Sequence, residues 1–217
     1  FYTIPDFHDT RKRYEKLKAD AAADPCGRVA EVRAELDWLL RVEDEACALT
    51  DRFRAGELPL RVTHNDTKIN NVLFDTQTHK PLVVIDLDTV MPGLIGHDFG
   101  DAIRFAANFV EEDCPDASKA GVNLNIYWAF AEGFLKYTAS TLTEAEVETL
   151  GTSCFALACE LATRFLDDYI LGDRYFKIKY PTHNLVRTRC QIALAKDMQR
   201  KMNAMNAIVL DCWRRNR

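Results

Sequence analysis

Apolar residues recur at helical spacing along most of the chain, with charged and polar residues between them. From Val29 to Phe53 the apolar positions fall mostly three or four residues apart, and charged residues fill the opposite face. This pattern predicts one long amphipathic helix. The same period returns from Ile126 to Phe134. Residues 1–5 instead have the character of a linker that leads into a helix.

The second half of the chain predicts two further helices. Thr143 and Glu146 have the spacing of a capping box, in which each side chain accepts a hydrogen bond from the backbone N–H of the other residue. An apolar period follows this box as far as Phe165, so a helix is expected to begin there. A last helix is predicted from about Asn184 to Ala207.

Three short apolar runs near the middle of the chain predict strands, namely Leu60–Val62, Val72–Phe74 and Leu82–Ile85. Polar residues 75–80 separate the last two runs, which is typical of a hairpin. The sequence contains no internal repeat and no low-complexity tract. The expected fold class is therefore α+β and predominantly helical, with residues 1–217 forming one domain around a small central β-hairpin.

The predicted hairpin brings two possible metal ligands together. If Val72 pairs with Ile85, then Asn71 and Asp86 emerge at the same end of the two strands. An amide oxygen and a carboxylate are oxygen ligands that suit Mg²⁺ when phosphates and waters complete its octahedron. This end of the hairpin is thus a candidate Mg²⁺ site.

The connector 64–71 carries the other candidate groups. It places polar side chains between two predicted strands, where an ordinary turn would more often contain Gly or Pro. Asp66 is free to accept the proton of an attacking hydroxyl, and Lys68 could supply a cation to a transferred phosphoryl group. Lys68 could equally be a solvated loop residue.

His64, Asp66 and Asn71 have the H-x-D-x-x-x-x-N spacing of a protein-kinase catalytic loop, and this core resembles that of the aminoglycoside phosphotransferases. The longer runs 63–71 and 84–93 resemble the N-acetylhexosamine 1-kinases in particular. The resemblance extends over the whole chain. It implies that residues 1–217 form the protein-kinase-like C-terminal lobe, which carries the catalytic loop and the substrate pocket.

This resemblance implies an enzyme that uses ATP and Mg²⁺ to phosphorylate the anomeric hydroxyl of N-acetylglucosamine or N-acetylgalactosamine. Asp66 would be the base, and Asn71 and Asp86 would hold Mg²⁺. Members of the family begin with a β-rich nucleotide lobe that no segment of this sequence resembles. Because Phe1 also stands where a natural chain has Met, we expect a fragment that is inactive alone.

The family's sugar pocket corresponds to Phe105, Arg164 and Tyr175, each of which has an alternative role. Phe105 could be a core residue, and Tyr175 could pack in an ordinary way. Arg164 lies on an otherwise apolar helix, where a charge is costly unless it is paired or offered to a ligand. An internal salt bridge to Asp167 or Asp168 is the alternative for Arg164.

Four other polar residues near the loop are expected to have structural roles. His64 should bond to the backbone near the loop, and Asp88 follows the proposed metal ligand. Asp98 and Asp101 flank a probable helix start, where carboxylates commonly cap free backbone amides. Asp98 belongs to an Asp-Phe-Gly triplet like the one that binds metal in protein kinases, but the hairpin geometry favours Asp86 as the ligand.

The composition argues against several kinds of partner. Lys and Arg number 28 against 33 Asp and Glu, a net charge of −5, so neither a nucleic acid nor an anionic membrane is expected. No segment approaches the roughly 18 apolar residues of a membrane span, and no signal sequence opens the chain. We expect a soluble, cytoplasmic protein with ATP and a small sugar as partners. The oligomeric state stays open.

The cysteines indicate a reducing environment. There are seven, an odd number, and none forms a C-x-x-C pair. Four of them lie in apolar helical patterns and are expected to be buried free thiols, namely Cys154, Cys159, Cys190 and Cys212.

Other functions remain open beside the sugar kinase. The same loop could act on choline, homoserine, methylthioribose or an aminoglycoside. A choline site would be an aromatic cage and an aminoglycoside site would be acidic, and Arg164 with few aromatic neighbours suits neither. A sulfatase is excluded because no Cys or Ser stands two residues before a proline. A binding fragment without activity is the alternative outside enzymes.

Overall fold

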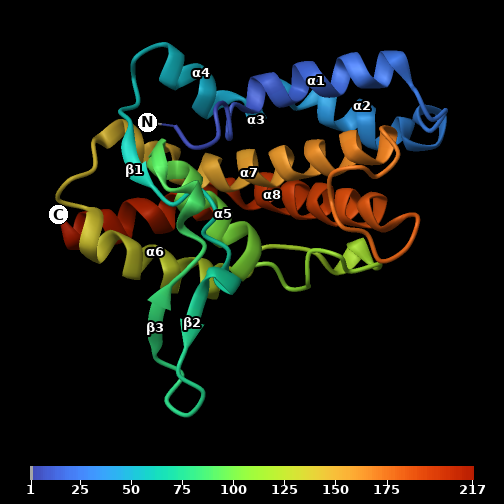
Figure 1. Ribbon diagram of the computed structural model, residues 1–217. Coiled ribbons are helices and arrows are strands. Elements are labelled where there is room, and N and C mark those ends of the chain that lie inside the picture. The colour runs from blue at the N-terminus through green and yellow to red at the C-terminus, as the bar shows by residue number, and fades with distance from the viewer. Residues whose placement is uncertain (1) are drawn as a thin grey trace.

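Two long helices form the centre of the molecule. The computed structural model describes residues 2–217, so Phe1 lies outside the described residues. Figure 1 shows α7 (Glu144–Ile170) and α8 (His183–Asn216) side by side and antiparallel. Both α5 (Ile95–Ala106) and α1 (Thr10–Ala23) pack against α7, and α6 (Leu124–Thr138) packs against α8. The fold is α+β and mostly helical, as the sequence predicted.

The predicted helix start at Thr143 is confirmed, but the predicted end of the last helix is wrong. The Thr143 and Glu146 side chains form the capping box, and α7 begins at the next residue, Glu144. The last helix, α8, continues beyond the predicted end to Asn216. Its extra turns bury Val209, Cys212 and Trp213, and burial of this kind supplies most helical stability in proteins.

The single helix predicted between Val29 and Phe53 is also wrong. The segment is divided into η1 (Val29–Val32), α2 (Arg33–Arg41), α3 (Glu43–Ala46) and α4 (Ala48–Arg54). The breaks fall at Val42 (φ −100°, ψ 10°) and Cys47 (φ −87°, ψ 1°), outside helical geometry. Both side chains are buried. Packing bends the chain there without Gly or Pro, so periodicity alone could not show the breaks.

The strands form two separate antiparallel pairs. They are β1 (Arg61–Thr63) with β4 (Met91–Gly93), and β2 (Val72–Phe74) with β3 (Pro81–Val84). The sequence predicted three of the four and missed β4. Short 3₁₀ turns lie at η2 (Ile69–Asn71), η3 (Leu87–Thr89) and η4 (Ala117–Lys119). The β2–β3 hairpin projects away from the helices in Figure 1.

The register predicted for this hairpin is shifted by one residue. Val72 lies opposite Val84 instead of Ile85, and the ladder is irregular between Leu73 and Phe74. The Asp75 side chain accepts hydrogen bonds from backbone N–H groups inside the turn, which fixes a turn geometry that simple pairing does not anticipate. The Ile85 N–H donates to the Asn71 carbonyl at 2.9 Å.

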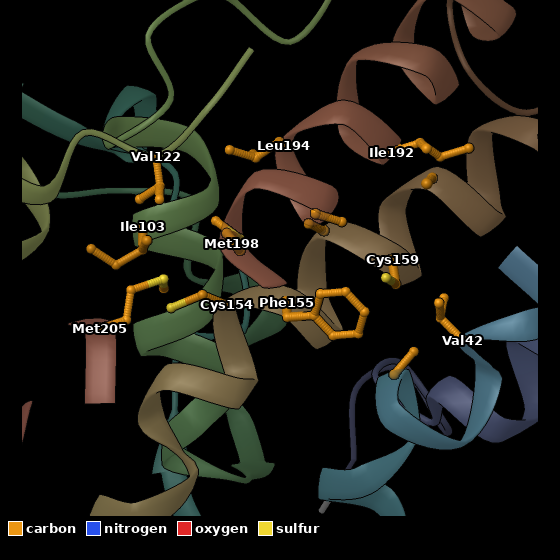
Figure 2. Close-up of a cluster of buried hydrophobic side chains, with 14 of the residues drawn as sticks. Val42, Ile103, Val122, Cys154, Phe155, Cys159, Ile192, Leu194, Met198 and Met205 are labelled. Carbon is orange, nitrogen blue, oxygen red and sulfur yellow. The ribbon is translucent and has the colours of Figure 1, made fainter. Parts of the chain in front are cut away.

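Figure 2 shows part of one buried cluster, which includes Cys154, Phe155 and Cys159 of α7 together with Met198 and Met205 of α8. The four cysteines predicted to be buried are buried and free, which confirms that expectation. Within residues 2–217, no helix is both long enough and apolar enough to cross a membrane.

Candidate active site

The polar connector lies between β1 and β2, and the Asn65 side chain fixes it from inside. Asn65 has φ of 64°, in the left-handed region that Asn tolerates better than most residues. Its amide donates to the carbonyls of Thr63 (3.2 Å) and Thr89 (3.0 Å), and its oxygen accepts from the Thr63 hydroxyl (2.9 Å). All three side chains are buried. The loop is therefore anchored to both β1 and the chain that follows β3.

Gly93 makes this anchor possible. A Cβ atom at Gly93 would lie 2.3 Å from the Thr63 hydroxyl oxygen and 2.6 Å from the Asn65 side-chain oxygen. Both distances are below what packed atoms tolerate, and both neighbours are buried. Strand β4 can approach the loop this closely only with glycine at position 93.

Asp98 holds the same loop from the helical side, and the sequence misjudged which amides it binds. The N-cap of α5 is Leu94, and no capping hydrogen bond from a side chain is present there. The Asp98 carboxylate instead accepts the backbone N–H groups of His64 (2.9 Å) and Asn65 (2.7 Å). Burial raises the pKa of Asp98, although the two N–H donors act in the opposite direction. Asp98 is thus occupied by the loop itself.

Asp66 lies between two polar neighbours that leave one of its oxygens available. Oδ2 accepts from the Lys68 ammonium at 2.6 Å and from the Asn71 amide at 2.9 Å. The Asn71 amide also donates to the Asp66 carbonyl at 2.8 Å. Within the described residues, Oδ1 of Asp66 has no hydrogen-bond partner, and the side chain is 25% exposed. A solvent-facing carboxylate oxygen in a fixed loop can accept a proton.

His64 makes two contacts with backbone atoms around the site. Its Nε2 lies 3.1 Å from the Ile85 carbonyl oxygen, and the Asp66 N–H donates to its Nδ1 at 3.3 Å. Nε2 therefore carries the proton and Nδ1 accepts, which is a neutral tautomer. The ring ties the loop to the hairpin.

Asp86 lies one residue further along the chain than the predicted pairing placed it, since the residue opposite Asn71 is Ile85. Because Asn71 pairs with Ile85, Asp86 comes one residue beyond the ladder. Asp86 has φ of 64° and is exposed, as is Asp88. Among the described residues, neither carboxylate takes part in a hydrogen bond or a salt bridge, and neither does the side-chain oxygen of Asn71. Two side chains whose oxygen atoms have no protein partner in the described chain thus lie at one end of the hairpin.

Asp101 does not cap a helix, contrary to the prediction. It is buried inside α5 and accepts from the Arg104 guanidinium at 2.7 and 3.0 Å. Arg104 also donates to Glu112 at 2.7 Å. Phe105 follows this ion pair and is half-buried. It lines a cavity of about 620 Å³ together with Asn70 of the 64–71 loop.

Arg164 and Tyr175 line a different cavity, of about 460 Å³, to which no residue of the 64–71 loop contributes. The structure therefore brings Phe105 close to the loop but does not place the three candidate pocket residues in one cavity. The Arg164 guanidinium lies 5.7, 5.9 and 5.4 Å from the ring centres of Phe7, Tyr175 and Phe176. Tyr175 is 73% exposed. The expectation of few aromatic neighbours around Arg164 is wrong.

The alternative salt bridge of Arg164 is not formed among the described residues. Asp167 pairs with Lys16 instead. The Asp168 carboxylate accepts the backbone N–H groups of three consecutive residues, 174–176, at 2.8 to 2.9 Å. Asp168 therefore shapes the loop that carries Tyr175.

Sequence reasoning missed a buried pair behind the 64–71 loop. His8 Nδ1 lies 2.8 Å from Glu160, and His8 Nε2 lies 2.9 Å from the Asn65 carbonyl oxygen. Thr10 also donates to Glu160, at 2.7 Å. The three elements involved are 57 to 152 residues apart in sequence, so no local motif could have shown this cluster.

The comparison with families of known proteins agrees with this geometry. The family model described as "Phosphotransferase enzyme family", abbreviated APH, matches residues 3–134. This range includes the anchored loop, the β2–β3 hairpin and the whole of α5.

Proposed function

The chain belongs to the phosphotransferase enzyme family, whose members transfer phosphate from ATP to small molecules, and from this premise we propose a specific acceptor. The proposed reaction is ATP-dependent phosphorylation of the anomeric hydroxyl of an N-acetylhexosamine. The observation that carries the proposed chemistry is the fixed Asp66 carboxylate, with one free oxygen, close to Asn71 and to the hairpin end that bears Asp86. The acceptor rests on the resemblance of residues 63–71 and 84–93 to N-acetylhexosamine 1-kinases.

In this proposal Asp66 positions and activates the acceptor hydroxyl. Its free oxygen takes the hydroxyl proton as the sugar oxygen forms a bond to the γ-phosphorus and the bond from that phosphorus to the ADP oxygen breaks. Lys68 beside it places a positive charge near the transferred group. The Asn71 amide holds Asp66 in the orientation that faces the solvent.

The residues at the hairpin end fit Mg²⁺. Asn71 and Asp86 offer oxygens that no protein donor occupies among residues 2–217, and Mg²⁺ is usually bound by one or two carboxylates together with phosphates and water. No group of three or more His, Cys, Asp or Glu side chains in the described chain could hold a metal alone. Mg²⁺, when bound, would neutralise charge on the phosphates.

The nucleotide is proposed to need a second lobe that packs on the hairpin. The β2–β3 hairpin and the residues after it expose large apolar side chains, including Leu73, Leu82, Val83, Val84 and Leu87. Exposed apolar surface of this kind usually marks an interaction site. Residues 1–217 are then the catalytic and substrate lobe, and they should not turn over ATP and sugar alone.

The charges around Arg164 favour a neutral acceptor over an aminoglycoside. The cavity beside Arg164 is also lined by Arg13, Lys16 and Arg174. Among the described residues that line it, two are acidic, namely Asp167 and Asp168. Lys16 and the loop amides occupy those two carboxylates. A polycationic substrate would find few free carboxylates here, whereas sugar hydroxyls and an acetamido carbonyl can accept hydrogen bonds from a guanidinium.

The test is a steady-state assay of the complete protein with ATP, Mg²⁺ and a panel of acceptors, with ³¹P NMR to identify the product. N-Acetylglucosamine and N-acetylgalactosamine should be better acceptors than choline or an aminoglycoside. Asp66→Asn should lower kcat by about 100-fold or more, as loss of a positioned base does. Asp88→Asn, an exposed carboxylate of the same hairpin end, is the matched control and should change kcat little. Preference for choline or an aminoglycoside would refute the acceptor and leave the kinase chemistry standing.

A further inference from the structure

His8 connects three parts of the fold, namely the segment before α1, helix α7 and the 64–71 loop. It lies before α1, its Nδ1 contacts Glu160 of α7, and its Nε2 contacts the Asn65 carbonyl oxygen. The His8 side chain is 5% exposed and that of Glu160 is fully buried. The Asn65 carbonyl belongs to the peptide that joins Asn65 to Asp66, so His8 holds the peptide on which the proposed base is mounted.

The two partners of His8 determine its charge. A carbonyl oxygen can only accept a hydrogen bond, and an ionised carboxylate can only accept as well. Both ring nitrogens of His8 must therefore donate, which requires the imidazolium form. The positive His8 ring and the Thr10 hydroxyl lower the pKa of Glu160 to about 2 despite its burial, so Glu160 is ionised. Burial works against a charged His8, but the Glu160 carboxylate raises its pKa overall.

Glu160 is the counter-ion, because the other charged groups around His8 are engaged elsewhere. Asp9 and Arg54 line the same cavity as His8, but these two side chains pair with each other. On α5, Asp101 pairs with Arg104.

None of the remaining ionisable neighbours acts as the counter-ion of His8 in place of Glu160. Asp6 pairs with Lys12, and Asp98 is held by two loop amides. Arg164 on α7 adds positive charge on the side of Glu160. The His97 ring lies 4.6 Å from the His8 ring, and burial together with the positive His8 lowers its pKa to about 3, so His97 stays neutral.

The carbonyl that His8 binds has no other anchor. The N–H of Asn65 is held by Asp98, and the Asn65 side chain is held by Thr63 and Thr89. Within the described residues, His8 is the one donor to the Asn65 carbonyl oxygen. Without it the same peptide would be held only through the Asp66 N–H, which donates to His64 Nδ1 at 3.3 Å, a long hydrogen bond. We expect this single bond to let the peptide tilt and redirect the Asp66 side chain, while the rest of the loop stayed attached.

We propose that His8, as an imidazolium paired with Glu160, is a positioning residue that orients the Asp66 carboxylate through the Asn65 carbonyl. This inference rests on the proposed function of Asp66 as the base and adds a requirement for a protonated histidine outside the catalytic loop. It follows that turnover should fall as pH rises through the pKa of His8, which lies above the usual 6.5 of histidine. A role in stability alone would not predict that dependence of kcat.

Two substitutions of His8 separate positioning from stability. In His8→Asn the amide nitrogen can take the place of Nδ1 and keep the Glu160 contact, but nothing reaches the Asn65 carbonyl. In His8→Gln the longer side chain can place its amide nitrogen at the Nε2 position and keep the Asn65 contact, but Glu160 loses its cation. His8→Gln should therefore be the less stable variant and the more active one.

The experiment measures kcat, KM and thermal unfolding of the complete protein across pH for wild type, His8→Asn, His8→Gln and Glu160→Gln. His8→Asn should lose between about 10-fold and 100-fold in kcat with little change in KM, the loss expected for a misplaced catalytic group. His8→Gln should stay within a few-fold of wild type and lose the alkaline fall in kcat. Glu160→Gln should move that fall to lower pH, because the carboxylate that raises the pKa of His8 is gone while burial still lowers that pKa.

Two further measurements keep the outcomes distinct. NMR of labelled histidine rings should show both nitrogens of His8 protonated at pH 6.5, and amide exchange at Asp66 should quicken in His8→Asn but not in His8→Gln. A neutral His8 ring, a kcat that follows stability across the variants, or unchanged exchange would overturn the inference. Absence of phosphoryl transfer by wild type to every acceptor would instead refute the proposed function, and the NMR and exchange results would still decide the role of His8.

Discussion

Asp168→Asn should weaken both the fold and the proposed sugar site. The buried Asp168 carboxylate accepts three backbone N–H groups of the loop 174–176 and the Asn184 amide, two donors on each oxygen. Asparagine has the same shape as aspartate, but an NH₂ group replaces one carboxylate oxygen. This NH₂ group cannot accept hydrogen bonds, so the two donors that face it lose their acceptor. The loop carries Tyr175 and Phe176, whose rings lie beside the Arg164 guanidinium.

The size of the effect follows from the two lost hydrogen bonds. Each hydrogen bond to a charged group contributes roughly 1.5–3 kcal/mol, and water can replace part of this because the loop is partly exposed, so we expect a loss of about 3–4 kcal/mol. In a domain of this size each kcal/mol shifts Tm by about 2–4 °C, which gives a decrease of about 6–16 °C. The KM for sugar should rise and that for ATP should not, since the loop lies away from the hairpin (Figure 1).

The neighbouring residue provides a matched control. Burial raises the pKa of Asp167 to about 6, above its usual 3.8, so the ionised form is disfavoured in the folded protein. Folding therefore favours protonated Asp167, and this pH-dependent part of its contribution to stability is lost as pH rises from about 4 to about 6. Asp167→Asn at pH 7 should leave Tm unchanged or slightly higher. The measurement is thermal unfolding by circular dichroism at pH 4, 6 and 7. A Tm for Asp168→Asn within 2 °C of wild type would refute the reasoning.

Three other substitutions test separate parts of the site. Asn71→Ala and Asp86→Asn should raise the Mg²⁺ concentration for half-maximal turnover, whereas Asp88→Asn should not, and equal effects of all three would contradict the ligand assignment. Gly93→Ala should lower the free energy of unfolding by about 1–3 kcal/mol in denaturant titrations, because its Cβ would overlap two buried side chains. Arg164→Ala should weaken sugar use several-fold in steady-state kinetics with unchanged ATP affinity, since a lost hydrogen bond to a neutral group costs about 0.5–1.5 kcal/mol.

The sequence could predict the structural features that depend on residues close together along the chain. The capping box at Thr143 is a local signal, and it marked the start of α7 correctly. The ends of helices and the breaks at Val42 and Cys47 depend on tertiary burial, which periodicity does not record. The hairpin was found from its two apolar runs, but its register was missed because the turn bonds of Asp75 were not considered.

The candidate site shows the same division. Asp66 and Asn71 lie in one short loop, so their spacing made them candidates, and the structure brings their side chains into contact. Asp98 was predicted near the site, but its partners lie 33 and 34 residues away and could not be inferred from a helix-start pattern. His8 and Glu160 carried no signal in the sequence, because only the fold brings them together.

The exposed hairpin also affects how the isolated chain behaves in solution. Strands β2 and β3 pair only with each other, so each has an outer edge of backbone groups without a neighbouring strand. Unpaired edges that carry apolar side chains are templates for intermolecular strand addition, and native proteins usually protect them with charge, proline or a covering element. All four residues of β3 are exposed, and only Pro81 among them protects the edge in this way. Aggregation of the chain at high concentration is therefore expected to begin at this ribbon.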